Sequence, residues 1–219
     1  MIKQGELSNQ LRIYIITDQG KYWRKNPIEL VRTAIQGGAT CIQFRYKGKV
    51  SRHAIELGKY IQKICTINRV LFIVNDHIEL VELLKADGLH VGKNDISVQE
   101  ARYRLGPSKI LGRSFGKDDV LDFPISLVNY LGVGPIYETP TKKDAGRPCG
   151  IQFPDEVRRR FNKPVVAIGG ITTENIHAVS SHADGVALIS SIAKSINPLL
   201  AVRNVRLEFH KIRQQTEPI

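Results

Sequence analysis

Three features of the sequence predict an α/β fold, a closed (β/α)8 TIM barrel. Short apolar segments rich in β-branched residues recur along the chain, stretches with helical spacing separate them, and polar residues gather where the apolar segments end. The chain has 219 residues, of which 42% are hydrophobic, enough for one large core. We therefore expect a single domain over residues 1–219 with its core at about 11–213. An open doubly wound sheet is the alternative arrangement of the same elements.

The expected strands are continuous apolar runs bounded by turn residues, as in a buried parallel sheet. They cover residues 12–17, 40–45, 70–75, 88–92, 109–114, 130–136, 165–170 and 185–190. Since strands and helices alternate in one chain, the sheet is expected to be parallel.

The first helices carry clear signals. The segment PIELVRTAIQGG has Pro27 at a first helical turn and glycines at its end, which are typical start and stop residues. In SRHAIELGKYIQKIC, helical spacing places Ile55, Tyr60, Ile61 and Ile64 on one face. Both segments are therefore expected to pack as amphipathic helices.

The later helices are less uniform. Thr172 or Thr173 is expected to cap the helix in TENIHAVSSH, and the last helix is expected within residues 198–214. Pro124 stands in the middle of GKDDVLDFPISLVNY, and proline breaks a helix interior. The fifth helix is therefore expected to be short or broken.

The chain is basic, with 32 Lys and Arg against 21 Asp and Glu and a net charge of +11. Such a charge suits a nucleic acid, a membrane surface or a phosphorylated small molecule. The nearest basic clusters, residues 158–163 and 203–213, are spaced like solvated helix faces, whereas nucleic-acid binding needs a clustered basic stripe. We expect no nucleic-acid partner.

Cysteine usage and hydropathy bear on location. Cys41, Cys65 and Cys149 are too far apart for a zinc pattern, and their odd number favours free thiols in a reducing compartment. The polar start and the lack of a long apolar stretch predict neither signal peptide nor membrane anchor. We expect a cytoplasmic protein without a membrane partner. The sequence leaves the oligomeric state open and is compatible with a homodimer.

Polar residues follow almost every expected strand. In a (β/α)8 barrel these strand ends form one mouth, where the site lies. They are Gln43, Arg45 and Lys47 after the second strand, Asn75 and Asp76 after the third, Asp95 after the fourth, Ser114 after the fifth, residues 139–142 after the sixth, Gly169 and Gly170 after the seventh, and Ser190 and Ser191 after the eighth.

The segment QFRYK predicts an anion site. Period two sends Gln43, Arg45 and Lys47 to the same side of an extended segment. Arginine binds phosphate bidentately and lysine acts as a point charge, so this side suits a polyanion. The alternative is a surface strand end with two solvated cations.

Asp76 and Asp95 stand at the ends of neighbouring strands. Two carboxylates in such positions can hold Mg²⁺, which favours carboxylate oxygens, waters and substrate phosphates. The alternative is a pair of helix caps, because both residues precede helix-like runs. His77 and His90 are expected to be a loop residue and a strand residue rather than metal ligands.

The last loops predict a second anion site. Glycines in AIGGIT, together with the loop after ADGVALIS, let backbone N–H groups approach a phosphate, although tight turns would require the same glycines. The loop of LGVGPIYETPTKKDAG adds two hydroxyls and two ammonium groups. Two anion sites and Mg²⁺ on one mouth imply two phosphorylated substrates, with pyrophosphate as a leaving group.

Taken in order, these segments resemble the thiamine phosphate synthase family over about residues 11–192. The resemblance rests on Q-x-R-x-K at residues 43–47, N-D at 75–76, KADGLHVGKND, G-P-x-Y-x-T-x-T-K at 134–142, AIGGI and ADGVALIS. The resemblance implies an enzyme that joins an aminopyrimidine methyl pyrophosphate to a thiazole phosphate by a dissociative mechanism, with Mg²⁺ as cofactor.

The resemblance also implies roles for individual residues. The pyrimidine pyrophosphate would be bound by Gln43, Arg45, Lys47, Asn75, Ser114 and Lys142, Mg²⁺ by Asp76 and Asp95, and the thiazole phosphate by Thr139, Thr141, Gly170, Ile189 and Ser190. Phe44, Tyr46 and Pro140 lie between these positions and are included in the substrate site. Arg45, Lys47, Ser114 and Lys142 are expected to act on the reacting groups.

The sequence departs from the family pattern at three places. Phe115 and Gly116 replace the usual residues after Ser114, Lys93 replaces a usual glutamine, and the fifth helix is interrupted. The alternatives are a related thiazole tautomerase and a non-catalytic phosphate-binding barrel. A tautomerase needs a positioned acid–base group, most often histidine. Because no histidine follows Ser114, we expect coupling without tautomerase activity.

Overall fold

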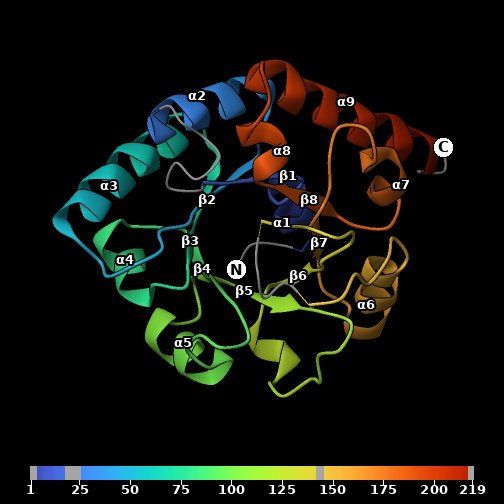
Figure 1. Cartoon of the computed structure of the whole chain (residues 1–219). Helices are drawn as coiled ribbons and strands as arrows, with labels where there is room; N and C mark the ends of the chain where they lie inside the picture. The colour runs from blue at the N-terminus through green and yellow to red at the C-terminus, as the bar shows by residue number, and fades with distance from the viewer. Residues whose placement is uncertain (1–3, 18–25, 142–145, 217–219) are drawn as a thin grey trace.

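The computed structural model describes residues 4–17, 26–141 and 146–216, with side chains to residue 211. Its parallel strands follow one another in sequence order, and β1 pairs with β8, so the barrel is closed (Figure 1). The strands are β1 (Ile13–Ile16), β2 (Cys41–Phe44), β3 (Leu71–Asn75), β4 (Gly88–Val91), β5 (Ile110–Phe115), β6 (Tyr130–Val133), β7 (Val165–Ile168) and β8 (Gly185–Leu188). This confirms the predicted TIM barrel and excludes the open sheet.

Helices form a ring around the strands (Figure 1). They are α2 (Pro27–Gly37), α3 (Arg52–Ile67), α4 (Ile78–Leu83), α5 (Val98–Leu105), α6 (Phe153–Phe161), α7 (Ile176–Ser180), α8 (Ser190–Ala193) and α9 (Pro198–Thr216). The fifth helix was expected to be short or broken. In the described chain between β5 and β6 there is no α-helix, and only the 3-10 turn η1 (Ile125–Leu127) follows Pro124.

Two helical details differ from the predictions. In α3 the buried face is Ala54, Gly58, Ile61 and Cys65, whereas Tyr60 is 64% exposed. The buried face of α3 is therefore centred on small residues rather than on Tyr60, and small residues let the helix approach the sheet closely. In α7 the N-cap is Asn175, and neither predicted threonine occupies that position.

A short helix, α1 (Gln4–Gln10), precedes the first strand and was not predicted. Its Leu7, with the following Leu11, belongs to the inner apolar cluster that also holds Tyr14, Ile73 and Val166. In Figure 1, α1 lies at the centre of the barrel view. It therefore closes the barrel at the end where the strands begin.

Polar side chains also form hydrogen bonds between neighbouring strands at this end of the barrel, where the strands begin. The residue before each even-numbered strand accepts a hydrogen bond from a backbone N–H at the start of the preceding strand. We call these four contacts the latches: Ile13 N to Thr40 Oγ1 (2.9 Å), Phe72 N to Asp87 Oδ2 (2.8 Å), Leu111 N to Asn129 Oδ1 (2.8 Å) and Val165 N to Asp184 Oδ2 (2.9 Å). Each latch satisfies a backbone donor that the sheet leaves unpaired.

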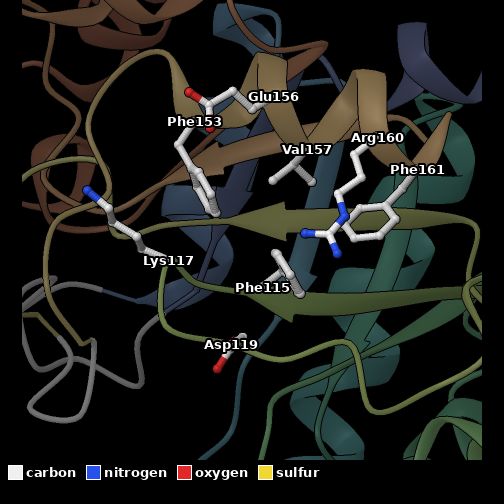
Figure 2. A pocket seen from close by; sticks show the side chains of 8 residues that line it. All are labelled: Phe115, Lys117, Asp119, Phe153, Glu156, Val157, Arg160 and Phe161. Atoms are coloured by element: carbon white, nitrogen blue, oxygen red, sulfur yellow. The ribbon is translucent and has the colours of Figure 1, made fainter.

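A cavity of about 110 Å³ lies beside the segment that replaces the fifth helix. Figure 2 shows it between the end of β5 and α6, with Phe115, Phe153 and Phe161 around it. Phe115 stacks on Phe153 at 6.4 Å and meets Phe161 edge-on at 5.5 Å. The cavity lies against a second apolar cluster, which includes Phe72, Phe115 and Val157 and which we call the outer cluster. None of the predicted site residues lines the cavity.

Arg102 of α5 anchors this same segment. Its guanidinium donates to the backbone oxygens of Leu127, Gly106 and Lys109 and to Asn129 Oδ1. A hydrogen bond from a charged donor stabilises a folded protein by about 1.5–3 kcal/mol. Loss of the donor also leaves the acceptor oxygens without a partner, which costs further stability. Arg102→Met is therefore expected to lower the free energy of unfolding by at least about 2 kcal/mol. Urea denaturation checks this against Arg104→Met, an exposed arginine on the same helix; equal losses would contradict it.

None of the helices in the described residues is both long and apolar enough to cross a membrane. Cys41, Cys65 and Cys149 are all buried free thiols, as the sequence predicts. Burial raises the pKa of Cys65 to about 12 and that of Cys149 to about 11, so both stay protonated near neutral pH.

Candidate active site

Most of the predicted site residues that the structure describes lie at the carboxyl ends of the strands, around one mouth; Phe44 and Tyr46 are the exceptions. They fall into two groups. One comes from β2, β3 and β4, on the left of the barrel in Figure 1, and the other from β6, β7 and β8, on the right. Ser114 stands between them at the end of β5.

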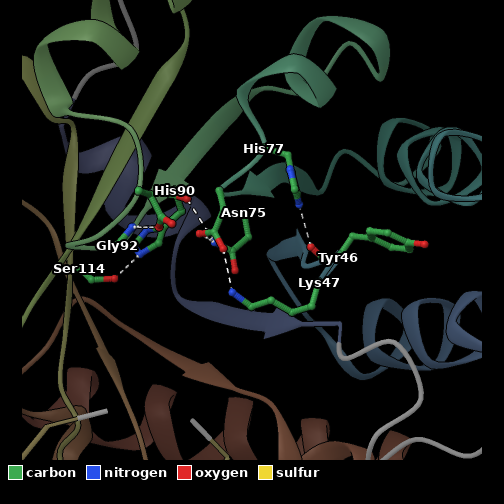
Figure 3. Close-up of polar contacts among 9 residues, drawn as sticks. Tyr46, Lys47, Asn75, His77, His90, Gly92 and Ser114 are labelled. Carbon is green, nitrogen blue, oxygen red and sulfur yellow. Dashed lines mark hydrogen bonds and ion pairs between the residues drawn. The ribbon is translucent and has the colours of Figure 1, made fainter. Parts of the chain in front are cut away.

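Lys47 and Asp76 form the centre of the first group. Lys47 Nζ lies 2.9 Å from Asp76 Oδ2, and Asn75 donates to the other oxygen of the same carboxylate (Figure 3). Asp76 has a φ of 63°, a left-handed conformation that aspartate tolerates better than most residues. Its backbone N–H donates to His90 O at 3.0 Å. The carboxylate is therefore fixed from several sides.

Asp95 brings a second carboxylate to this place. Its Oδ2 accepts a hydrogen bond from the backbone N–H of Gly92 at 2.6 Å. Burial, followed by a hydrogen bond with Asp76, raises the pKa of Asp95, while Lys47 acts in the opposite direction. Two like charges held together in this way favour a cation between them.

The structure excludes the alternative that these carboxylates cap helices. The N-cap of α4 is His77, without a side-chain capping bond, and α5 is capped by Ser97, whose hydroxyl accepts from Glu100 N at 3.2 Å.

His77 and His90 occupy a loop and a strand, as predicted. In the described part of the chain, no group of three or more His, Cys, Asp or Glu side chains could hold a metal ion.

The QFRYK segment alternates as predicted, with one correction. Gln43 is buried in the barrel interior, Arg45 is held at the mouth by its backbone N–H on Thr17 Oγ1 (3.0 Å), and Lys47 reaches Asp76. Phe44 is buried in the outer cluster and Tyr46 packs partly against it. Their side chains turn toward the helices, because period two places them on the opposite face, so they do not line the mouth.

Ser114 has a neighbour that the sequence reading missed. His90 Nε2 lies 3.0 Å from Ser114 Oγ (Figure 3). No histidine follows Ser114 in the sequence, but the structure brings one beside it from another strand. His90 is 24 residues away in the chain, but β4 and β5 are adjacent and place the two side chains on the same inner face.

The second group gathers hydroxyls from two loops. Thr141 Oγ1 and Ser190 Oγ are 3.1 Å apart, and Thr139 Oγ1 accepts from Thr141 N at 3.3 Å. Pro140 between them is exposed. Lys142 lies outside the described residues. The hydroxyls of Thr141 and Ser190 thus meet although β6 and β8 are not neighbours in the sheet.

Ser190 begins the short helix α8, directly after β8, and Ile189 is its N-cap residue. In (β/α)8 barrels, the loops after the last two strands and the N-terminus of a short extra helix commonly bind phosphate. The position of α8 therefore matches a recurring phosphate site.

Gly169 and Gly170 have φ values of 99° and 68°, so their turn requires glycine, as the alternative reading stated. They also let the loop after β6 pack closely: Ile136 N donates to Ile168 O at 2.9 Å and Tyr137 N to Gly169 O at 3.1 Å. A Cβ on Gly170 would stand 2.6 Å from Tyr137 Cβ and 2.7 Å from Glu138 O.

Gly170→Ala is expected to destabilise the protein by about 2–3 kcal/mol, since about 1–2 kcal/mol comes from the left-handed backbone and the rest from the clash. Gly150→Ala is the control, because Gly150 has a φ of 79° but nothing within 4 Å of its Cβ position. Thermal unfolding of both variants measures the difference. Equal destabilisation would show that the loop contact contributes nothing.

The chain matches the family model described as thiamine monophosphate synthase over residues 13–192. It is 40% identical over 211 residues to the thiamine-phosphate synthase of Streptococcus agalactiae, covering 94% of each chain. It is 38% identical to the one from Moorella thermoacetica, covering 90% of this chain and 95% of the other.

Solved structures agree. A thiamine phosphate pyrophosphorylase from Pyrococcus furiosus superposes with a TM-score of 0.81 and 30% identity, covering 94% of this chain and 98% of that one. A phosphoribosyl anthranilate isomerase from Thermus thermophilus, 16% identical with a TM-score of 0.65, shares the fold alone. With the family model spanning most of the chain and relatives this similar over nearly their whole length, the chain belongs to the thiamine monophosphate synthase family.

Proposed function

We propose that this chain joins an aminopyrimidine methyl pyrophosphate to a thiazole phosphate, forming thiamine phosphate and releasing pyrophosphate. Its family makes it an enzyme, a transferase. The observation that supports this reaction best is the presence of two separate groups on one mouth. Lys47, Asp76 and Asp95 suit a pyrophosphate with a cation, and Thr141 and Ser190 suit a second phosphate.

The residues present fit Mg²⁺. Asp76 and Asp95 would hold it, and burial, followed by the hydrogen bond with Asp76, raises the pKa of Asp95. Mg²⁺ commonly takes one or two carboxylates and completes its coordination with water and substrate phosphates. When bound, it supplies positive charge that neutralises a leaving pyrophosphate.

The residues of the chain bind the pyrophosphate and orient the carboxylate. Arg45 and Lys47 offer cations to the pyrophosphate, and Asn75 orients Asp76. The C–O bond to pyrophosphate breaks first, the electron pair leaves with the phosphate oxygen, and the thiazole nitrogen then bonds to the pyrimidine methylene carbon. Such a dissociative reaction needs leaving-group stabilisation and alignment rather than an activated protein nucleophile.

Thr139, Thr141, Gly170 and Ser190 would align the thiazole phosphate on the other side of the mouth. Their hydroxyls and backbone N–H groups are the usual partners of a phosphate monoester. The position of Thr141 beside Ser190 supports one shared phosphate site from two loops.

The test is direct. Purified protein with both phosphorylated halves and Mg²⁺ is expected to yield thiamine phosphate and an equal amount of pyrophosphate, and neither half alone should yield either product. Absence of product in both Mg²⁺ and Mn²⁺ would reject the function.

A second experiment tests the tautomerase alternative. When the protein is incubated with a thiazole carboxylate phosphate tautomer alone, the NMR spectrum of that tautomer is expected to stay unchanged. Because His90 stands beside Ser114, this second arm is a necessary check against the tautomerase alternative.

Location and assembly belong to the same proposal. Three buried free thiols suit a reducing, cytoplasmic environment. The assembly proposal is a homodimer, which light scattering of the purified protein tests.

A further inference from the structure

A row of hydrogen bonds crosses the barrel interior from one predicted substrate residue to another. Gln43 Nε2 lies 2.8 Å from Tyr14 Oη, Tyr14 Oη lies 2.9 Å from Tyr130 Oη, Tyr130 Oη lies 3.0 Å from His90 Nδ1, and His90 Nε2 lies 3.0 Å from Ser114 Oγ. We call these five residues the relay. Figure 3 shows its end at His90 and Ser114.

The barrel has room for the rings of the relay because two neighbouring strand positions are glycines. Gly112 on β5 has no Cβ, and one there would stand 2.2 Å from Tyr130 Cζ. A Cβ on Gly132 of β6 would stand 2.9 Å from His90 Cε1. Two strand glycines thus give space to the rings, although glycine weakens a strand interior. Gln43, Tyr14 and Tyr130 are all buried among apolar residues, where polar groups persist only when they are hydrogen-bonded.

The Gln43 amide donates to Tyr14. Each tyrosine then accepts one hydrogen bond and donates one if the Tyr14 proton goes to Tyr130 and the Tyr130 proton goes to His90 Nδ1, and we take this direction for the relay. Burial raises the pKa of both tyrosines well above the ordinary value, so each always has one proton to donate. With Nδ1 accepting, neutral His90 carries its proton on Nε2 and donates it to Ser114 Oγ. The hydroxyl proton of Ser114 is then left for a ligand.

The reverse direction would suit an anionic ligand poorly. If Ser114 donated to His90, it would present only lone pairs to the mouth. A phosphorylated substrate has acceptor oxygens, so it favours the direction in which Ser114 donates. At the other end, the same direction leaves Gln43 Oε1 as the amide atom that can accept from an amino group.

We infer that Tyr14, Tyr130 and His90 are positioning residues, which hold His90 as the Nε2–H tautomer so that Ser114 donates to the pyrimidine pyrophosphate and Gln43 accepts from its amino group. The identity of this ligand rests on the proposed function. None of the three residues needs to touch the substrate, because each acts through the next.

The tautomer can be measured without any substrate. In ¹⁵N-labelled protein, the ring nitrogens of His90, assigned by their loss in His90→Gln, are expected to show a protonated Nε2 and an unprotonated Nδ1. Tyr130→Phe removes the donor to Nδ1 and is expected to shift His90 toward a mixture of tautomers. A protonated Nδ1 in the unmodified protein would overturn the inference, and would instead make His90 an acceptor for the Ser114 proton.

Kinetics provide the second measurement. Tyr130→Phe keeps the ring but loses one hydrogen bond, and it is expected to lower kcat/KM for the pyrimidine pyrophosphate about tenfold. KM for the thiazole phosphate should not change. Tyr14→Phe should have a smaller effect, because the contacts of His90 with Tyr130 and Ser114 remain. Tyr103→Phe is the control, since Tyr103 is 87% exposed.

The outcomes separate the two proposals. Unchanged kinetics in Tyr130→Phe, or equal losses for both substrates together with a lower Tm, would reject a positioning role. If the unmodified protein forms no thiamine phosphate, the proposed function fails, while the tautomer measurement still decides whether the relay has the inferred direction.

Discussion

Replacement of Asp76 by alanine is expected to lower kcat at least about a hundredfold, the usual loss when charge stabilisation in the transition state is removed. Asp76 is one of two carboxylates at the proposed Mg²⁺ site, and its loss also releases Lys47 from its ion pair. Because alanine is strained at a φ of 63°, Asp76→Asn should accompany it, since asparagine tolerates this conformation. Both variants should lose activity alike, and excess chelator should have the same effect on the unmodified protein.

The same cation site can be tested by measuring how Asp95 affects the stability of the folded protein. Burial and Asp76 raise the pKa of Asp95, so the folded state holds that proton more tightly than the unfolded state does. The ionised carboxylate therefore costs stability as pH rises through the raised pKa, and the cost is absent below the unfolded pKa. Asp95→Asn should raise Tm at neutral pH without Mg²⁺ while lowering activity. Mg²⁺ should raise the Tm of the unmodified protein but not that of Asp95→Asn.

Asp118→Asn is the control for both arms, because Asp118 is an exposed partner of Arg147 on the loop after β5. It should leave activity and the Mg²⁺ response unchanged. Full activity of Asp76→Asn in chelator, or a lower Tm for Asp95→Asn, would show that the two carboxylates do not form a cation site.

Lys142→Ala is expected to lower kcat about a hundredfold, whereas Lys143→Ala should change it less than about threefold. These residues lie outside the described part of the chain, so the prediction comes from the resemblance, which matches Lys142 to a pyrophosphate ligand and leaves Lys143 in solvent. The structure adds that Thr141, the residue before them, is held against Ser190 at the mouth.

Steady-state rates of the two variants, with saturating substrates, test this lysine pair. The two changes remove the same charge from adjacent positions, so the overall net charge cannot explain a difference between them. Equal effects would mean that the loop presents its side chains differently from the family pattern.

The fold followed from sequence because each strand is a short apolar run and each break between strands has its own turn residues. The ends of those strands then located Asp76, Asp95, Thr141 and Ser190, since parallel strands bring their carboxyl ends to one mouth. Pro124 indicated that the fifth helix is interrupted, and the structure goes further by leaving only a 3-10 turn there.

Other features depend on contacts between distant residues. His90 meets Ser114 only because β4 and β5 pair in one register, and no local pattern reports that. The helix α1 contains a single buried residue, Leu7, so its sequence lacks an apolar period. Phe44 is a different case, because the local alternation that groups Gln43 with Arg45 already places it on the opposite face of the strand.

The latches divide the barrel into modules. Each joins an odd-numbered strand to the next, so a break in the chain at Pro107–Ser108, between β4 and β5, would leave two intact latches in each fragment. The first fragment would carry Asp76 and Asp95, and the second Thr141 and Ser190. In the proposed reaction, the second fragment would hold the thiazole phosphate, whereas the pyrimidine pyrophosphate would contact both fragments, because Ser114 and Lys142 belong to the second. The pyrophosphate would therefore lie across the seam between two half-barrels.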